Sequence, residues 1–448
     1  MNRTIRLFDT YEGKKREFVP LEEGKADIYY CGPTVYNYVH LGNFRPTVTF
    51  DLLTRVMREC GYEVRCVSNY TDIDDKIIKE AKKENKTEKE LSEFYIKAYE
   101  DCLNKLNILP LYDHPKASEY ITKMASFIHD LENEGAAYQG GDDIYFRVNS
   151  VGGYGNLSKQ KIDDLVSGSR IDVSEKKENP LDFALWKLTD DDGIKFDTEI
   201  GTGRPGWHTE CVVMVNSVFR KPLIDIHGGG FDLKFPHHEN EIAQSEAHNH
   251  TRLANYWMHV GFLLTDGVKM SKSLGNSILA KDVLTRHSGN AIRLFFQTTH
   301  YRAPVNYTEE GLCSFDKLDK RYYASLRKAF CLLSLAGIKE GKLLQEKYAA
   351  FMDALADDLN VANAMTVFDA MLKELNTLSM KKDTDLSHLA DVYHTLLRFT
   401  EILGLSYTFA PLSDEDRTLL AEFNKAREEK NFARSDELRP VLMERGLL

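Results

Sequence analysis

The chain contains 448 residues, of which 42% are hydrophobic and 28% are charged, and its formal net charge is −11. This composition is typical of a soluble globular protein of roughly three domains, and the negative charge disfavours general nucleic-acid binding while leaving room for a local basic groove. The sequence lacks an apolar run near the ~20 residues of a membrane span and an apolar secretory segment, and its seven cysteines are too few for a disulfide scaffold, so we expect a cytoplasmic protein.

The first part of the chain predicts a parallel α/β sheet. Strands are expected at residues 26–31 and 62–69, and helices with one apolar face at residues 44–61 and 72–85. A glycine-rich, polar segment then interrupts the pattern, which returns at residues 221–248 as an apolar strand, a glycine turn and a helix. Alternation of strand and helix is typical of a parallel sheet, so we read the polar segment as an insertion between its two halves.

The last part of the chain predicts helices alone. Apolar residues recur at three- and four-residue spacing in residues 313–337, 362–380 and 389–404, and a helical hairpin is expected at residues 419–446. We therefore predict an α/β domain with a parallel sheet, split by an insertion and followed by an all-α helical bundle. The expected regions are the α/β domain at 1–126 and 201–265, the insertion at 127–200, a connecting region at 266–312, the bundle at 313–405 and a C-terminal helical region at 406–448.

Two short motifs, far apart in the chain, carry groups suited to phosphate. HLGN at residues 40–43 lies between a predicted strand and a predicted helix, where free N–H groups and the helix dipole favour phosphate. KMSKS at residues 269–273 places Lys269 and Lys272 on one loop, where two ammonium groups can stabilise charge on a transferring phosphoryl group. Each motif alone also fits an ordinary loop, but their combination favours nucleotide chemistry.

A cluster of histidine and glutamate, HHENE at residues 237–241, indicates metal ligands. His237 and Glu241 are four residues apart and share one face of a predicted helix, although a solvated polar face has the same spacing. The HExxH pattern of metalloproteases fails, because Ile242 stands where the second histidine should be. Cysteine is a natural further ligand for zinc. Cys31 and Cys211 are the candidates, since each lies where a predicted sheet element meets a loop or a helix.

Five segments, in order along nearly the whole chain, resemble the cysteinyl-tRNA synthetase family. HLGN and KMSKS resemble the two signature motifs of class I aminoacyl-tRNA synthetases. The segments that resemble the cysteinyl family itself are YYCGPTVYNYVHLGNFRP, NYTDIDDKIIK, RPGWHTEC, DIHGGGFDLKFPHHENEIAQ and KMSKSLGN. The resemblance implies that the α/β part is a Rossmann-like catalytic domain. It also implies activation of L-cysteine by ATP, accompanied by Mg²⁺, to an enzyme-bound cysteinyl-adenylate, and then transfer of cysteine to tRNA(Cys).

The same resemblance implies the residues of the site. One zinc ion per chain would be held by Cys31, Cys211, His237 and Glu241. The cysteine pocket would include Gly32, Thr71, Trp207 and His227. The ATP site would contain His40, Gly42, Asn43, Gly229, Gly230, Asp232, Lys269 and Lys272. Of these, His40, Asn43, Lys269 and Lys272 would be catalytic, the two lysines acting on the α-phosphate.

Zinc suits this substrate because cysteine and serine differ by one atom. A pocket that uses shape and hydrogen bonds alone separates such analogues by only a few kcal/mol. Zinc prefers a thiolate and lowers the pKa of the thiol, whereas a serine hydroxyl would have to ionise at far greater cost. Direct contact between zinc and the substrate sulfur would therefore give selectivity without an editing domain, for which the insertion is too short.

The C-terminal part of the chain bears on tRNA binding and on two alternative functions. Basic stretches at residues 317–328 and 425–434 could contact tRNA phosphates or could simply be solvated. The chain ends at Leu448, earlier than relatives commonly do, which puts the strength of anticodon recognition in doubt. Two other functions remain open: a ligase that joins cysteine to an amino sugar, which should lack the helical C-terminal part, and a catalytically inactive, synthetase-like tRNA binder. We expect a monomer without membrane contacts.

Overall fold

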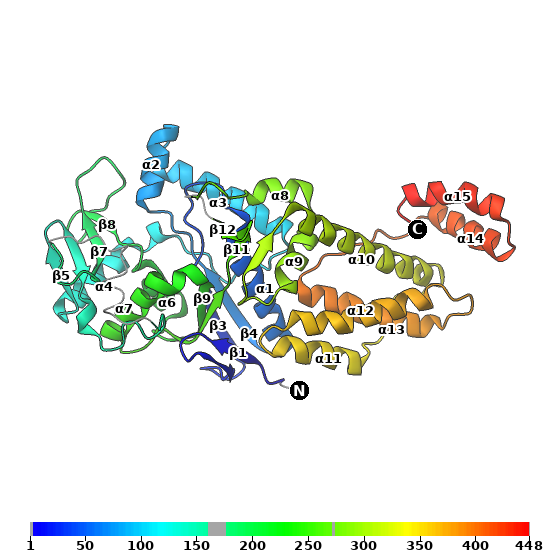
Figure 1. Cartoon of the computed structure of the whole chain (residues 1–448), viewed down its shortest axis with the longest axis horizontal. Coiled ribbons are helices and arrows are strands. Elements are labelled where there is room, and N and C mark those ends of the chain that lie inside the picture. The colour runs from blue at the N-terminus through cyan, green and yellow to red at the C-terminus, as the bar shows by residue number, and fades with distance from the viewer. Residues whose placement is uncertain (1–2, 160–175, 271–273, 448) are drawn as a thin grey trace. The chain divides into compact units, whose positions relative to one another are not determined.

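The computed structural model describes residues 3–159, 176–270 and 274–447 (Figure 1). These residues divide into two compact units, which are described separately. The first unit comprises Met1–Arg286 and Tyr301–Tyr307, and the second comprises His287–His300 and Thr308–Leu448. Among the described helices, none is long and apolar enough to cross a membrane.

The first unit is built on a parallel sheet of four strands in the order β10-β9-β3-β4. Its strands are β3 (Lys25–Tyr30), β4 (Glu63–Ser68), β9 (Ile224–Gly230) and β10 (Ala254–Val260). Side chains alternate between its two faces. Tyr30 stacks on Phe50 of α1 (Phe44–Glu59), while the neighbouring Tyr29 points to the other face and contacts Met214 of α6 (Glu210–Phe219). Both faces are covered by helices, as parallel sheets require.

A second sheet begins within the segment predicted as an insertion, residues 127–200, and its last strand lies just beyond that segment. It is antiparallel, has the order β5-β6-β7-β8, and packs with α4 (Ile121–Asn133) and α6 in one apolar core. Its strands are β5 (Ala137–Gly140), β6 (Asp143–Phe146), β7 (Phe183–Leu188) and β8 (Gly203–Pro205). Because β8 leads into residues 206–209 and α6, this sheet fixes the start of the segment that carries Trp207 and Cys211.

Smaller elements complete the first unit. The hairpin is β1 (Arg6–Asp9) with β2 (Lys14–Glu17), and a small sheet consists of β11 (Leu263–Thr265), β12 (Val268–Lys269) and β13 (Val305–Tyr307). The remaining helices named here are α2 (Asp75–Glu84), α3 (Glu88–Lys105), α7 (Glu239–Asn249) and α8 (Ala280–Arg286). HLGN follows β3, and HHENE follows β9. Both therefore lie at the carboxyl edge of the parallel sheet, where open α/β sheets bind ligands.

The second unit is entirely helical over its described residues. Its helices are α9 (Gly289–Thr298), α10 (Glu309–Leu335), α11 (Gln345–Ala356), α12 (Val361–Leu378), α13 (Leu386–Leu403), α14 (Asp414–Glu428) and α15 (Phe432–Glu444). Side-chain caps start most of them, since Ser288, Thr308, Asn360, Asp385, Ser413 and Asn431 accept hydrogen bonds from first-turn N–H groups. A parallel α/β unit and a helical unit confirm the predicted fold class.

In the helical unit, the buried side chain of Arg293 packs against Gly404, a glycine with positive φ at the end of α13. Arg293 of α9 is buried, and its Nε and Nη2 donate to the carbonyl of Leu403 at 3.1 and 2.9 Å. Gly404 ends α13 with φ +73°, and a Cβ there would lie 2.0 Å from Nη2 of Arg293. Gly337 has almost the same backbone, φ +74°, but no described atom would lie within 4 Å of its Cβ.

We expect Gly404→Ala to lower the free energy of unfolding more than Gly337→Ala. The positive φ costs each variant about 1 kcal/mol. Displacement of the Arg293 side chain adds to the Gly404→Ala cost, for a total of about 2–4 kcal/mol. Urea denaturation of both variants and the parent chain measures the difference, and equal losses for the two would contradict this account of the packing.

Candidate metal and nucleotide site

Four predicted metal ligands lie together at the carboxyl edge of the sheet. Cys31 directly follows β3, Cys211 lies in the first turn of α6, and His237 and Glu241 lie where the chain enters α7. The Cys31 Sγ lies 3.7 Å from the Cys211 Sγ and 3.7 Å from Oε1 of Glu241. Nε2 of His237 lies 3.7 Å from the Cys211 Sγ and 3.0 Å from Oε1 of Glu241. Ligands from three separate segments therefore converge on one point.

These separations match the donor set to zinc. Zinc takes four sulfur, nitrogen or oxygen ligands in a tetrahedron, at about 2.3 Å for sulfur and about 2.0 Å for nitrogen. Such a tetrahedron has edges of about 3.3–3.8 Å. The four edges measured here span 3.0–3.7 Å, so small rotations of side chains would accommodate the ion. Two thiols, an imidazole and a carboxylate also form a donor set that binds zinc in preference to Mg²⁺.

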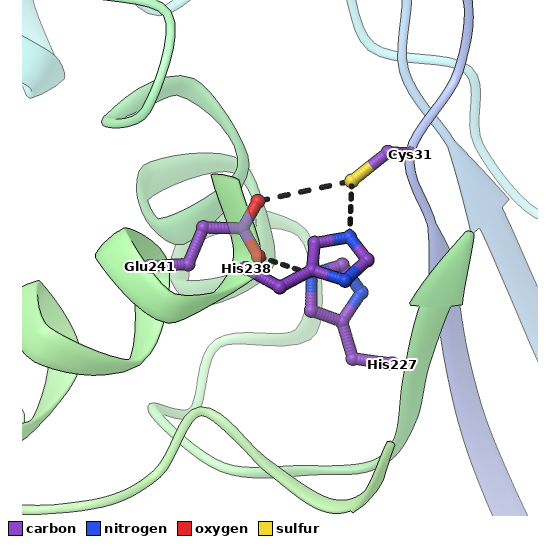
Figure 2. A group of neighbouring side chains, drawn as sticks. All are labelled: Cys31, His227, His238 and Glu241. Atoms are coloured by element: carbon purple, nitrogen blue, oxygen red, sulfur yellow. Dashed lines mark hydrogen bonds and ion pairs between the residues drawn. The ribbon is translucent and has the colours of Figure 1, made fainter. Parts of the chain in front are cut away.

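A second set of donors overlaps the first (Figure 2). Figure 2 shows Cys31 and Glu241 together with His227, on β9, and His238. Nε2 of His238 lies 3.3 Å from the Cys31 Sγ, while its Nδ1 lies 2.8 Å from Nε2 of His259. Nε2 of His227 lies 2.6 Å from Oε2 of Glu241, and its Nδ1 lies 2.9 Å from the carbonyl oxygen of Tyr29. Both nitrogens of His227 face oxygen acceptors. Its contact with Oε2 holds the Glu241 carboxylate in place, so that the other oxygen, Oε1, faces the Cys31 thiol.

The charges in this buried group favour a cation. Burial opposes ionisation of Glu241, but His227, His237 and His238 hold the pKa of its carboxyl well below the usual range. Burial also opposes ionisation of Cys211, yet hydrogen bonds with Cys31 and His237 bring the pKa of its thiol to about 7. Burial, with Cys211 and Glu241 nearby, raises the pKa of Cys31 well above its usual value. A divalent cation would therefore bind with release of the Cys31 proton.

His208 supports the metal ligands and was not predicted from the sequence. Its Nδ1 lies 3.0 Å from Nδ1 of His237, and burial, together with the neighbouring His237, lowers the pKa of His208 to about 3. A neutral His208 accepts a hydrogen bond from Nδ1–H of His237, so that Nε2 of His237 faces Cys211 and Glu241. The side-chain amide of Gln244 holds His208 in place by donating to its backbone carbonyl at 2.8 Å. A hydrogen bond on the second nitrogen is how metal-binding histidines are usually oriented.

We expect His208→Leu to weaken zinc binding about 10–100-fold, because loss of the acceptor frees His237 to turn. His208→Gln keeps an acceptor oxygen and should lose much less. Zinc affinity in a chelator-buffered titration measures both. Equal affinities in His208→Leu and the parent chain would show that His208 does not orient His237.

The residues predicted for the cysteine pocket fall into two groups. Trp207 and Gly32 line the cavity beside the metal ligands, and the Trp207 ring stacks on His237 at 4.1 Å between centroids. Thr71 and His227 are buried and are not among the described residues that line this cavity. Thr71 donates to Oε2 of Glu210 at 2.7 Å. A Cβ at Gly32 would lie 1.8 Å from the carbonyl oxygen of Asn69, so only glycine fits beside Cys31.

The predicted nucleotide-binding residues line the same cavity, whose volume is about 420 Å³. Described lining residues from the predicted ATP site are His40, Gly42, Asn43, Gly230, Asp232 and Lys269. Oδ1 of Asn43 accepts from the backbone N–H of His40 at 3.1 Å, and Nζ of Lys269 lies 3.1 Å from Oδ2 of Asp232. Gly229 is not among the described lining residues, and Lys272 lies outside the residues that the structure describes. The cavity is also lined by Lys76, to which the sequence assigned no role.

The basic stretches predicted as tRNA contacts contain residues already engaged within the helical unit. Arg327 is buried and donates to the carbonyls of Gly446 and Ala410, both at 3.1 Å, so it ties α10 to the C-terminal segment. Arg434 pairs with Glu422 at 2.7 Å and with Glu437 at 2.6 Å. Arg327 therefore has a structural role, and the charge of Arg434 is largely balanced by its neighbours.

Comparisons with known proteins agree on one family. The family described as "tRNA synthetases class I (C) catalytic domain" matches residues 17–317, and the DALR domain matches residues 350–408. A cysteine–tRNA ligase of Shouchella clausii is 44% identical over 455 residues, covering 99% of this chain and 97% of the relative. Relatives with the same name from Halalkalibacterium halodurans and Staphylococcus aureus are 41% identical, with coverage of 99% of this chain and 97% of each relative.

Solved structures show the same fold at much lower sequence identity. Methionyl-tRNA synthetase of Mycobacterium tuberculosis, bound to methionyl-adenylate, matches 92% of this chain and 96% of its own with a TM-score of 0.61 at 14% identity. A leucyl enzyme of Agrobacterium radiobacter, in a ternary complex with tRNA, matches 86% of this chain and 85% of its own with a TM-score of 0.61 at 11% identity.

Proposed function

The chain belongs to the cysteine–tRNA ligase family of class I synthetases, and from this premise we propose how its cavity selects and activates cysteine. The chain is a ligase that charges tRNA with cysteine, and class I synthetases use ATP with Mg²⁺ for this reaction. We assign zinc to Cys31, Cys211, His237 and Glu241. When bound there, zinc would hold the thiolate form of the substrate, which the hydroxyl of serine cannot match.

The single observation that carries this proposal is the shared cavity. Cys31 from the metal-binding group lines the same cavity as His40, Asn43 and Lys269 from the predicted nucleotide site. The amino acid and ATP would therefore meet in one enclosure, as formation of an adenylate requires. Trp207, which stacks on His237 and lines the cavity, would cover the side chain of the substrate and limit access of water.

The phosphate-binding residues would act on the leaving pyrophosphate. Backbone groups at Gly42, with His40 and Asn43, would hold the phosphates at the start of α1, where the helix dipole favours negative charge. Asp232 would contact the ribose. Lys269, together with Lys272, would stabilise charge on the α-phosphate as the cysteine carboxylate attacks and pyrophosphate leaves. Thr71 and His227, both buried, would set the pocket through Glu210 and Glu241 respectively.

Two measurements test this assignment. Cysteine-dependent exchange of pyrophosphate into ATP reports on adenylate formation, and transfer of radiolabelled cysteine to tRNA(Cys) or to an amino sugar identifies the acceptor. We expect exchange, charging of tRNA(Cys) and no transfer to the sugar. Exchange with transfer to the sugar alone would favour the amino-sugar ligase, and absence of exchange would leave a tRNA binder. The helical second unit, which such a sugar ligase should lack, favours the tRNA acceptor.

A further inference from the structure

Another group of side chains of metal-ligating type lies in the helical unit and is not among the described residues that line the cavity. His287, Cys313 and Asp316 each offer one ligand atom, and these three atoms lie within 4.8 Å of one another. His287 immediately precedes the Ser288 cap of α9, whereas Cys313 and Asp316 lie in the first two turns of α10. Neither the predicted function nor any motif of the sequence assigns these residues a role.

The helical geometry explains why the three groups meet. Cys313 and Asp316 are three residues apart on α10, and Glu309 is four residues before Cys313, so all three share one face. The imidazole of His287 packs against that face with only 2% of its side chain exposed. Its Nδ1 faces Oδ2 of Asp316, and its Nε2 lies 2.9 Å from Oε1 of Glu309.

We propose that Nδ1 of His287, Sγ of Cys313 and the carboxylate of Asp316 bind a divalent transition metal of the zinc class. The metal would replace the proton between His287 and Asp316, with Cys313 supplying the soft ligand that zinc and cobalt prefer and that Mg²⁺ and Ca²⁺ do not. Glu309 would then accept the remaining N–H of His287, which is the carboxylate–histidine–metal arrangement of many zinc sites. The half-buried Cys313 and Asp316 leave a route for the ion and a fourth position for water.

The same residues do not form a nucleophilic catalytic group. A cysteine nucleophile needs a histidine nitrogen as its base within hydrogen-bond reach. Here both ring nitrogens of His287 face carboxylates, one from Asp316 and one from Glu309. Both ring nitrogens are thus engaged with carboxylates, whose negative charge favours a cation, and His287 is not free to act as a base for Cys313.

Metal at this site would cross-link the start of α9 to α10 within the helical unit. The segment at 287–290 is already fastened to α10, because the Ser288 N–H donates to Oδ1 of Asp316 at 3.2 Å and its Oγ donates to Oδ2 of Asp319 at 2.7 Å. A bond from the ion to both His287 and α10 would strengthen this attachment. Since the ion would bind the folded form, the thermal stability of the unit would rise with the concentration of free zinc.

Counting bound metal in the full-length chain tests the proposal, and a background variant separates the two sites. Cys211→Ser disables the site in the cavity, so the zinc it retains after dialysis reports on the second site. We expect one zinc ion per chain in Cys211→Ser and none when Cys313→Ser is added. Cys331→Ser is the matched control, because Cys331 is a buried thiol of the same helix, outside the group, and it should leave the count unchanged.

Cobalt and a milder variant give independent readouts. Co²⁺ added to Cys211→Ser should produce a thiolate-to-cobalt absorption band that disappears in the variant that also carries Cys313→Ser. Glu309→Gln and His287→Gln, made in the same background, guard against misfolding of the cysteine variant. We expect Glu309→Gln to weaken zinc affinity about 10–100-fold. The proposal is overturned if Cys211→Ser retains no zinc, or if its zinc content and cobalt spectrum stay the same when Cys313 or His287 is replaced. Because these variants are compared in a background that already disables the cavity site, failure to find zinc in the cavity of the parent chain would not change these results.

Discussion

His237→Ala is expected to remove zinc from the cavity and to abolish most of the preference for cysteine over serine. The loss of a direct ligand should exceed the roughly 10–100-fold weakening that accompanies loss of a supporting residue. Without the ion, only the shape of the pocket and its hydrogen bonds remain, and these discriminate close analogues by roughly 10–200-fold. Zinc content and the ratio of kcat/KM for cysteine and serine in pyrophosphate exchange measure the two effects.

The matched control for this prediction is the neighbouring histidine. His238 belongs to the second overlapping donor set, and its Nε2 lies closer to the Cys31 Sγ, at 3.3 Å, than the Cys211 Sγ does, at 3.7 Å. If His237 is the ligand, His238→Ala should keep most of the zinc in the cavity, and Cys211→Ser should lose that ion. Zinc retained in His237→Ala but lost from His238→Ala would instead assign the ion to the group in Figure 2. A His237→Ala variant that keeps full selectivity for cysteine would refute the role of zinc in recognition.

The sequence predicted those parts of this site that depend on local spacing. His237 and Glu241 are four residues apart and follow the one residue with non-helical backbone in this turn, Phe235, so the kink does not separate them. Local spacing does not predict that Cys31 and Cys211 lie close together, because their approach depends on β9 pairing with β3 and on α6 lying over that face of the sheet. Positions where a predicted sheet element meets a loop or a helix suggested both cysteines, and the family resemblance joined them to the histidine and the glutamate.

The remaining supporting residues carry no periodic signal. His208 and His227 meet the ligands through contacts across 29 and 14 residues, and a single histidine on an apolar strand is indistinguishable from a core residue in the sequence. The same holds for His287, which meets Asp316 across 29 residues. Adjacency to Trp207 in RPGWHTEC was the one local indication for His208. Long-range contacts between buried polar groups are set by sheet order and helix packing, which a single sequence does not encode as spacing.

Lys269→Ala is expected to slow adenylate formation while leaving cysteine binding nearly unchanged. Lys269 lies at the end of β12, where its backbone carbonyl accepts from the side chain of Asn276 at 3.1 Å and its Nζ lies 4.4 Å from the centre of the Phe262 ring. These contacts hold the ammonium group at the cavity, where charge develops on the α-phosphate. Loss of one such group from a transition state typically costs about 10²–10³-fold in kcat.

Comparison with two other lysine variants separates this role from general electrostatics. Lys281→Ala removes a cation of the same unit that pairs with its neighbour Asp282 at 2.9 Å and lies over Tyr38, so it should leave the exchange rate unchanged. Lys269→Arg keeps the charge and should recover part of the rate. Single-turnover formation of the adenylate measures the chemical step, and quenching of Trp207 fluorescence, with Trp207 beside the proposed pocket, follows cysteine binding. Weaker cysteine binding with an unchanged single-turnover rate would contradict the role of Lys269 in the chemical step and place it in the amino-acid pocket.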